Sequence, residues 1–133
     1  MAEALINSRS TTLVAHSAGV VPSGYIDPHT IHVMNEIEID ISANRSKSTE
    51  IFKEKEIDIV ITLCATAYEM CPPWLYQEKL SVHWGFKDVS GKSTRDYRRL
   101  RDEIRAHLDR FLALYRPDAT DEEIQTHLRR LMR

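Results

Sequence analysis

The chain has 133 residues, 42% of them hydrophobic and 29% charged, which suits one domain with a core and excludes a disordered or membrane-spanning chain. Eighteen basic residues against twenty acidic ones give a net charge of −2, which argues against a nucleic-acid-binding surface. Two cysteines are too few for a disulfide framework, so we expect a protein of the reducing cytoplasm.

The first half of the chain predicts short elements. Residues 1–7 are good helix formers without a start signal, and they contain no apolar run of signal-peptide length. Residues 12–17, TLVAHS, alternate enough to predict a short strand. Pro28 suits the first position of a helix that runs through Ile37, and a further short helix is expected at residues 49–53.

The second half contains the clearest strand. Residues 57–63, IDIVITL, are rich in β-branched side chains and predict a strand buried on both faces. Residues 80–86 predict a second strand, parallel and adjacent to the first, and residues 93–115 predict a long helix. Because strands alternate with helices, we expect an α/β fold whose parallel sheet has helices on both faces.

A boundary is expected near Pro117, which ends the long helix. We expect residues 1–115 to form the α/β domain and residues 116–133 to form an amphipathic helical extension. The sequence Thr120-Asp-Glu-Glu123 is a capping box, which predicts the start of a helix reaching residue 132.

Cys64 and Cys71 stand seven residues apart, directly after the buried strand. In a continuous helix they would lie about 10.5 Å apart along the axis, whereas a disulfide needs Cα atoms within about 7 Å. Either the pair stays as ordinary thiols or the segment rearranges when they bond. Two thiols without C-x₂-C spacing do not suit zinc, and we interpret His29 and His32 as surface residues, so no metal site is expected.

Three blocks carry a family resemblance: VITLCATAYEMCPPW, HWGFKDVSG and RRLRDEIRAHL. In these blocks, and from residue 1 to about residue 112, the chain resembles the thioredoxin-coupled arsenate reductases, which share the fold of the low-molecular-weight protein tyrosine phosphatases. The resemblance implies reduction of arsenate to arsenite by a relay of cysteines. It also implies an external reductant, thioredoxin or a glutaredoxin-type protein, and no bound cofactor.

The resemblance assigns roles to three residues. Cys64 matches the thiol that attacks an arsenylated cysteine, and Cys71 matches the thiol that then closes a disulfide with Cys64. Asp88 matches the acid that protonates the leaving oxygen. The family has proline after this aspartate, whereas this chain has Val89, which loosens the loop.

The family's nucleophile loop, Cys-x₅-Arg-Ser/Thr, precedes the segment that matches MAEAL. The chain begins at Met1, so we expect the loop and a central first strand to be missing from it, and the chain alone to be inactive toward arsenate. Without that neighbour, the strand at residues 12–17 should leave the chain unstable, prone to aggregate, or paired with a strand of another copy.

Two alternatives stay open. One is a non-catalytic pseudoenzyme that serves as a binding or assembly module of the same fold. The other is a phosphatase, in whose mechanism Cys64 and Cys71 have no place. The expected partners are the reductant and, where the loop exists, arsenate; nucleic acid and membranes are not expected.

Overall fold

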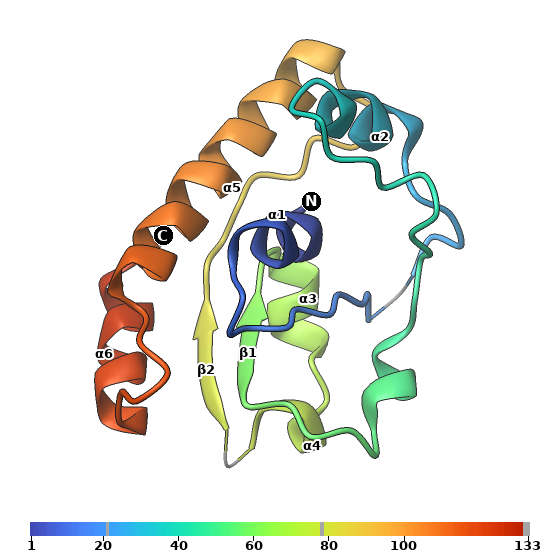
Figure 1. The fold of residues 1–133 in the computed structure, drawn as a ribbon. Coiled ribbons are helices and arrows are strands. Elements are labelled where there is room, and N and C mark those ends of the chain that lie inside the picture. Colours follow the sequence, from blue (N-terminus) through green and yellow to red (C-terminus); the bar gives the residue numbers. More distant parts are fainter. Residues whose placement is uncertain (21, 78, 132–133) are drawn as a thin grey trace.

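The structure, a computed structural model, describes residues 1–20, 22–77 and 79–131. Its elements follow in the order α1 (Ala2–Arg9), α2 (Pro28–Asn35), the 3₁₀ helix η1 (Thr49–Phe52), β1 (Ile59–Thr62), α3 (Ala65–Met70), α4 (Pro73–Tyr76), β2 (Leu80–His83), α5 (Thr94–Leu114) and α6 (Asp121–Arg130) (Figure 1). Residue 132, where the last predicted helix was to end, lies outside the described residues. Over the described part of the chain, no helix is both long and apolar enough to cross a membrane.

The sheet confirms the predicted parallel pair. β1 and β2 run side by side in register from Ile59–Leu80 to Thr62–His83. Side chains alternate between the two faces of a strand. Val82 therefore packs into the core with α5, while the neighbouring His83 points to the opposite face and contacts Tyr68 of α3. The parallel sheet thus has helices on both faces, as predicted.

The core is centred on Trp84, just after β2. Its ring meets Phe111 of α5 edge-on at a centroid distance of 5.8 Å. Its indole Nε1 donates a 3.0 Å hydrogen bond to the carbonyl of Leu128 in α6. Helix α5, which carries Phe111, begins with a capping box. In it, the side chains of Ser93 and Asp96 each accept a hydrogen bond from the backbone N–H of the other residue. Trp84 therefore joins the sheet to both C-terminal helices.

Helix α6 covers the outer edge of β2. The side-chain amide of Gln125 donates to the carbonyl of Ser81 at 2.9 Å and accepts from the N–H of Ser81 at 3.2 Å. These are the bonds that another strand would make at this edge. Ile124 and Leu128 of the same helix belong to the core cluster. The domain boundary after residue 115 stays a prediction.

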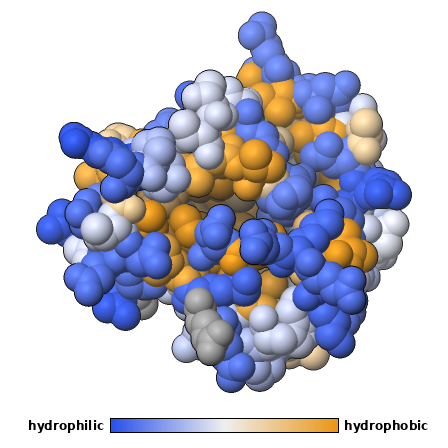
Figure 2. Space-filling model, turned by 60° about the horizontal axis from the view of Figure 1, so that its bottom comes forward, coloured by the Kyte–Doolittle hydropathy of each residue, from blue (hydrophilic) through white to orange (hydrophobic). Residues whose placement is uncertain are grey.

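At the outer edge of β1, the described residues supply no pairing strand. The carbonyl of Thr62 accepts from the N–H of Trp84 at 2.8 Å, so Thr62 faces β2. Alternate residues face opposite edges, and Ile61 therefore presents its N–H and C=O to the far edge. Among the described residues, no strand pairs with β1 there. Figure 2 shows the molecule with the bottom of Figure 1, where β1 and β2 begin, turned toward the reader. From this side, apolar side chains are seen gathered around a hollow.

The predicted strand at residues 12–17 is wrong. This segment forms no ladder, and the neighbouring bridge joins Gly19 to Ser48. Side chains of α1 bind its backbone instead. The amide of Asn7 donates to Ala15 O at 3.0 Å and accepts from Ala15 N at 2.8 Å, and Glu3 accepts from Ser17 N at 3.1 Å. These bonds satisfy backbone groups that a strand would give to its neighbour.

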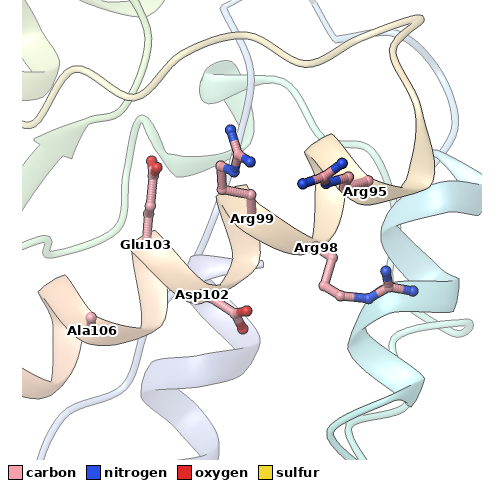
Figure 3. A pocket seen from close by; sticks show the side chains of 6 residues that line it. All are labelled: Arg95, Arg98, Arg99, Asp102, Glu103 and Ala106. Atoms are coloured by element: carbon pink, nitrogen blue, oxygen red, sulfur yellow. The ribbon is translucent and has the colours of Figure 1, made fainter.

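Helices α2 and α5 are joined by an ion-pair cluster. Arg98 points from α5 toward α2 (Figure 3) and donates from Nε and Nη2 to Glu36 at 2.8 and 2.6 Å. Arg101, whose side chain is only 8% exposed, donates to Glu36 at 2.8 Å and to the Val33 carbonyl at 2.7 Å. The hydrogen bonds to Glu36, chiefly those from Arg98, lower the pKa of its carboxyl group from 4.5 to about 2.

Candidate redox site

The two cysteines stand at the two ends of α3. Cys64 follows β1 and is the N-cap residue of the helix, and its carbonyl accepts a 3.0 Å hydrogen bond from Tyr68 N. Cys71 is the C-cap residue, and its extended backbone leads into Pro72 and α4. A helix of this length keeps the two Cα atoms about 10 Å apart. Both thiols are free, and a disulfide requires α3 to unwind.

The two thiols have different surroundings. Cys64 is exposed at the N-terminus of α3. Cys71 is half-buried, and this burial raises the pKa of its thiol. Cys64 is therefore the more accessible of the two sulfur nucleophiles in this conformation.

His83 lies on the face of the sheet that α3 covers. Its Nδ1 is hydrogen-bonded to the hydroxyl of Thr62 at 2.7 Å. The ring of Tyr68, from the middle of α3, contacts the imidazole at a centroid distance of 4.6 Å. On a third side, a Cβ placed on Gly85 would lie 3.0 Å from His83 Nε2, so the glycine leaves room for the ring.

Asp88 lies in the exposed loop between β2 and α5. Its carboxylate accepts a 2.9 Å hydrogen bond from Ser90 N, and the backbone and side chain of Ser90 lower its pKa. No hydrogen bond of the described residues joins Asp88 to either cysteine. The pKa of Tyr97 is raised to about 12, mainly by the hydrogen bond that its hydroxyl donates to Asp27 at 2.5 Å, and the charge of Asp88 contributes least to this rise.

A hollow of about 390 Å³ lies beside the start of α1. Residues from the start of α1, from the stretches 17–19 and 22–27, from the start of α2 and from the stretch 41–47 line it, among them Glu3, Asp27 and Lys47. Lys47 donates to Glu3 at 3.2 Å inside it. Neither cysteine lines this hollow, and neither lines the larger open hollow of about 560 Å³ on the charged face of α5 shown in Figure 3.

The two histidines considered as metal ligands are bound elsewhere. His29 stacks on Tyr97 and its Nδ1 lies 3.3 Å from the carboxylate of Asp27, while His32 Nε2 lies 3.7 Å from Glu36. Over the described part of the chain, no group of three or more His, Cys, Asp or Glu side chains gathers as a metal site would require.

Fold and site define an α/β protein with a dithiol at the carboxyl end of a parallel strand. Residues 1–127 match the family described as low molecular weight phosphotyrosine protein phosphatase. The chain belongs to this family.

Its relatives include several arsenate reductases. That of Bacillus cereus strain 03BB102 is 39% identical over 99 residues, which span 72% of this chain and 70% of the relative. Arsenate reductase 1 of Staphylococcus saprophyticus is 38% identical over 96 residues, which span 72% of both chains.

Solved structures agree. An arsenate reductase in the reduced state superimposes with a TM-score of 0.70 at 28% identity, over 84% of this chain and 85% of that one. An arsenate reductase in the phosphate binding state gives a TM-score of 0.71 at 29% identity over the same shares. The resemblance to the arsenate reductases and the α/β fold that it implied are both confirmed.

The structure adds residues that had no expected role. Thr62 of β1 and Tyr68 of α3 both contact His83 of β2, on the face of the sheet that α3 covers. Sequence reasoning missed them because their contact depends on the register of the two strands. The block HWGF, which already supported the resemblance, was the available signal for His83.

Proposed function

We propose that this chain acts in the reduction of arsenate to arsenite, as the part of a cysteine relay that carries Cys64 and Cys71. The observation that supports this most is the position of the two thiols at opposite ends of α3, directly after a parallel strand, in a chain 39% identical to an arsenate reductase. A short helix with no buried side chain is cheap to unwind, which suits a pair of thiols that must approach each other.

The proposed chemistry has two exchange steps. The Cys64 thiolate attacks the sulfur of an arsenylated cysteine, and the S–As bond breaks with its electron pair left on arsenic, which is released as arsenite. The Cys71 thiolate then attacks Cys64, expels the first cysteine as a thiolate and leaves a Cys64–Cys71 disulfide. A dithiol reductant such as thioredoxin or a glutaredoxin-type protein supplies two electrons and two protons to reopen it.

The different environments of the thiols support this order. Cys64 is exposed and reacts first, whereas Cys71 becomes a good nucleophile when unwinding of α3 removes the burial that raises its pKa. Asp88 is proposed to protonate the leaving oxygen when arsenate is bound. It has to give up its hydrogen bonds to Ser90 for that role, because those bonds hold it ionised.

The thiol that carries arsenic has to come from outside these residues, since Cys64 and Cys71 are the chain's two cysteines. We therefore propose that the 133-residue chain alone does not reduce arsenate. We also propose that it works in the cytoplasm, where a dithiol reductant keeps the pair reduced.

The dithiol is tested by oxidising the reduced chain with glutathione disulfide and counting thiols by alkylation and mass spectrometry. We expect two thiols to be lost together in a monomer, and one NADPH per chain to be consumed when thioredoxin and its reductase are added. Cys64→Ser and Cys71→Ser are the matched controls, and neither should form an internal disulfide. Disulfide-linked dimers alone, or thiols that stay free, would favour the non-catalytic module.

The order of the thiols is tested by alkylation at rising pH. We expect Cys64 to react first, and Cys71 in the Cys64→Ser variant to need a higher pH, because burial raises its pKa. In denaturant the two single-cysteine variants should react alike.

Catalysis by the chain alone is tested with arsenate, thioredoxin, thioredoxin reductase and NADPH. We expect no arsenate-dependent oxidation of NADPH. Arsenate-dependent turnover that Cys64→Ser abolishes would show that these residues suffice.

A further inference from the structure

Tyr68 contacts the sheet from the middle of α3. The helix has no buried side chain, and its Tyr68 ring lies against His83 at a centroid distance of 4.6 Å with an angle of 32° between the ring planes. Tyr68 itself is 62% exposed, so the contact covers one side of the phenol and leaves the rest in water. The ring contact therefore adds to a helix that is otherwise weakly held.

His83 is held by residues of the sheet. Its imidazole is hydrogen-bonded to Thr62 at 2.7 Å and lies close over Gly85. Thr62 and His83 are directly paired in the register of β1 and β2. The imidazole is thus fixed to the sheet, while Tyr68 is fixed to the helix that has to move.

The contact is present in a structure in which both thiols are free. Closing a disulfide brings the Cα atoms of Cys64 and Cys71 within about 7 Å, and a wound α3 holds them about 10 Å apart. Tyr68 lies between them, four residues after Cys64, so unwinding α3 carries the phenol away from the fixed imidazole.

We propose that the Tyr68–His83 ring contact is a latch that holds α3 wound and thereby shifts the redox equilibrium of Cys64 and Cys71 toward the dithiol. Both rings are positioning residues in this proposal, since they act through α3. The proposal rests on the proposed function in one respect, namely that the two thiols form a disulfide.

The test is the equilibrium of the full chain with reduced and oxidised glutathione. Protein dithiol plus glutathione disulfide gives protein disulfide plus two glutathione molecules, and the two protein forms are separated after acid quenching and alkylation. Tyr68→Ser removes the ring without changing helix propensity, since serine and tyrosine rank together. Tyr68→Phe keeps the ring, and Glu69→Ser alters an exposed neighbour in the same helix.

Aromatic pairs of this kind contribute enough to change an equilibrium about three- to tenfold. We expect Tyr68→Ser to shift the equilibrium toward the disulfide by about three- to tenfold. A tenfold shift corresponds to a reduction potential of the pair that is lower by about 30 mV. Tyr68→Phe and Glu69→Ser should stay within about twofold of the parent, by the same aromatic and helix-propensity estimates. His83→Ala should shift the equilibrium in the same direction as Tyr68→Ser, and the double variant should go no further than the larger single change.

A spectroscopic measurement tests the latch directly. The ring protons of His83 should be shielded by Tyr68 in the dithiol form, and oxidation should abolish the shielding together with the cross-peaks between the two rings. Tyr68 is exposed, so its variants should fold even where His83→Ala does not, and the serine and phenylalanine variants then decide the question.

An unshifted equilibrium in Tyr68→Ser, or ring cross-peaks that survive oxidation, would overturn the latch and leave the proposed function standing. A parent chain that forms no internal disulfide would overturn both.

Discussion

The two outer edges of the small sheet differ in the partners of their backbone groups. At β2, the side chain of Gln125 binds both backbone groups of Ser81, and α6 closes over the edge. At β1, Ile61 faces outward with no paired strand among the described residues. Both edges present backbone N–H and C=O groups that need hydrogen-bond partners. The difference therefore lies in which partners the rest of the chain supplies to each edge.

One side-chain amide can end a sheet when a helix places it correctly. Gln125 supplies a donor and an acceptor in the spacing of a peptide group. Its position depends on apolar contacts of the same helix, namely Ile124 and Leu128 in the core, and on the bond from Trp84. The covered edge is therefore maintained mainly by packing, and the hydrogen bonds complete it.

The largest expected effect comes from removing that packing. Trp84→Ala should destabilise the fold by about 3–5 kcal/mol, because a ring only 1% exposed is lost together with its bond to α6. Val14→Ala, at a side chain 79% exposed, should change stability by less than about 0.5 kcal/mol. Urea unfolding of both variants measures the difference, and equal losses would contradict the central place given to Trp84.

A smaller effect is expected at the edge itself. Gln125→Ala should cost about 1–3 kcal/mol, because Ser81 is left with an unpaired donor and acceptor under α6. The chain's second glutamine, the exposed Gln77, is the matched control, and Gln77→Ala should be nearly neutral. If the two variants unfold at the same denaturant concentration, α6 does not need the amide to cover the edge.

Amide hydrogen exchange compares the two edges without any mutation. The N–H of Ser81 is bound by Gln125 and should exchange at least about tenfold more slowly than the N–H of Ile61. Ile61 should also exchange faster than its neighbour Thr62, which faces β2. Protection of Ile61 that grows with protein concentration would indicate that a strand of a second copy pairs with β1.

Acid should act on both edges equally. Glu36 has a pKa of about 2 in the folded chain against 4.5 in the unfolded one, so its contribution to stability is present above pH 4.5 and is lost as the pH falls toward 2. Glu36→Gln should flatten the pH dependence of unfolding in this range. Since Glu36 lies at neither edge, the difference between the Ser81 and Ile61 amides should persist, and an acid-induced change confined to one edge would contradict this.

Much of the fold could be predicted because local patterns carry it. The apolar run around β1 and the Thr120 capping box each specify an element by residues close in the chain. The strand at residues 12–17 could not be excluded, because its alternation is genuine. Whether such a segment becomes a strand depends on a neighbour to pair with, and here α1 offers Asn7 and Glu3 instead.

The candidate site also contains residues that could be predicted from local sequence and a contact that could not. Cys64 and Cys71 are visible in the sequence because their spacing and their position after a strand are local properties. The contact of Tyr68 with His83 joins residues fifteen apart in the chain and depends on strand register, which a single sequence specifies poorly. The roles of Cys64, Cys71 and Asp88 stay predictions until the oxidation and turnover experiments are done.

The hold of α1 on the following segment has a consequence for how this chain can vary. Asn7 and Glu3 bind backbone atoms of Ala15 and Ser17, and backbone atoms are the same whatever the side chain. The conformation of the segment therefore depends on side chains of α1. Substitutions at positions 15 and 17 keep the backbone atoms that form these hydrogen bonds. In a library of variants, we expect many substitutions to be tolerated at Ala15 and Ser17, and few at Asn7 and Glu3.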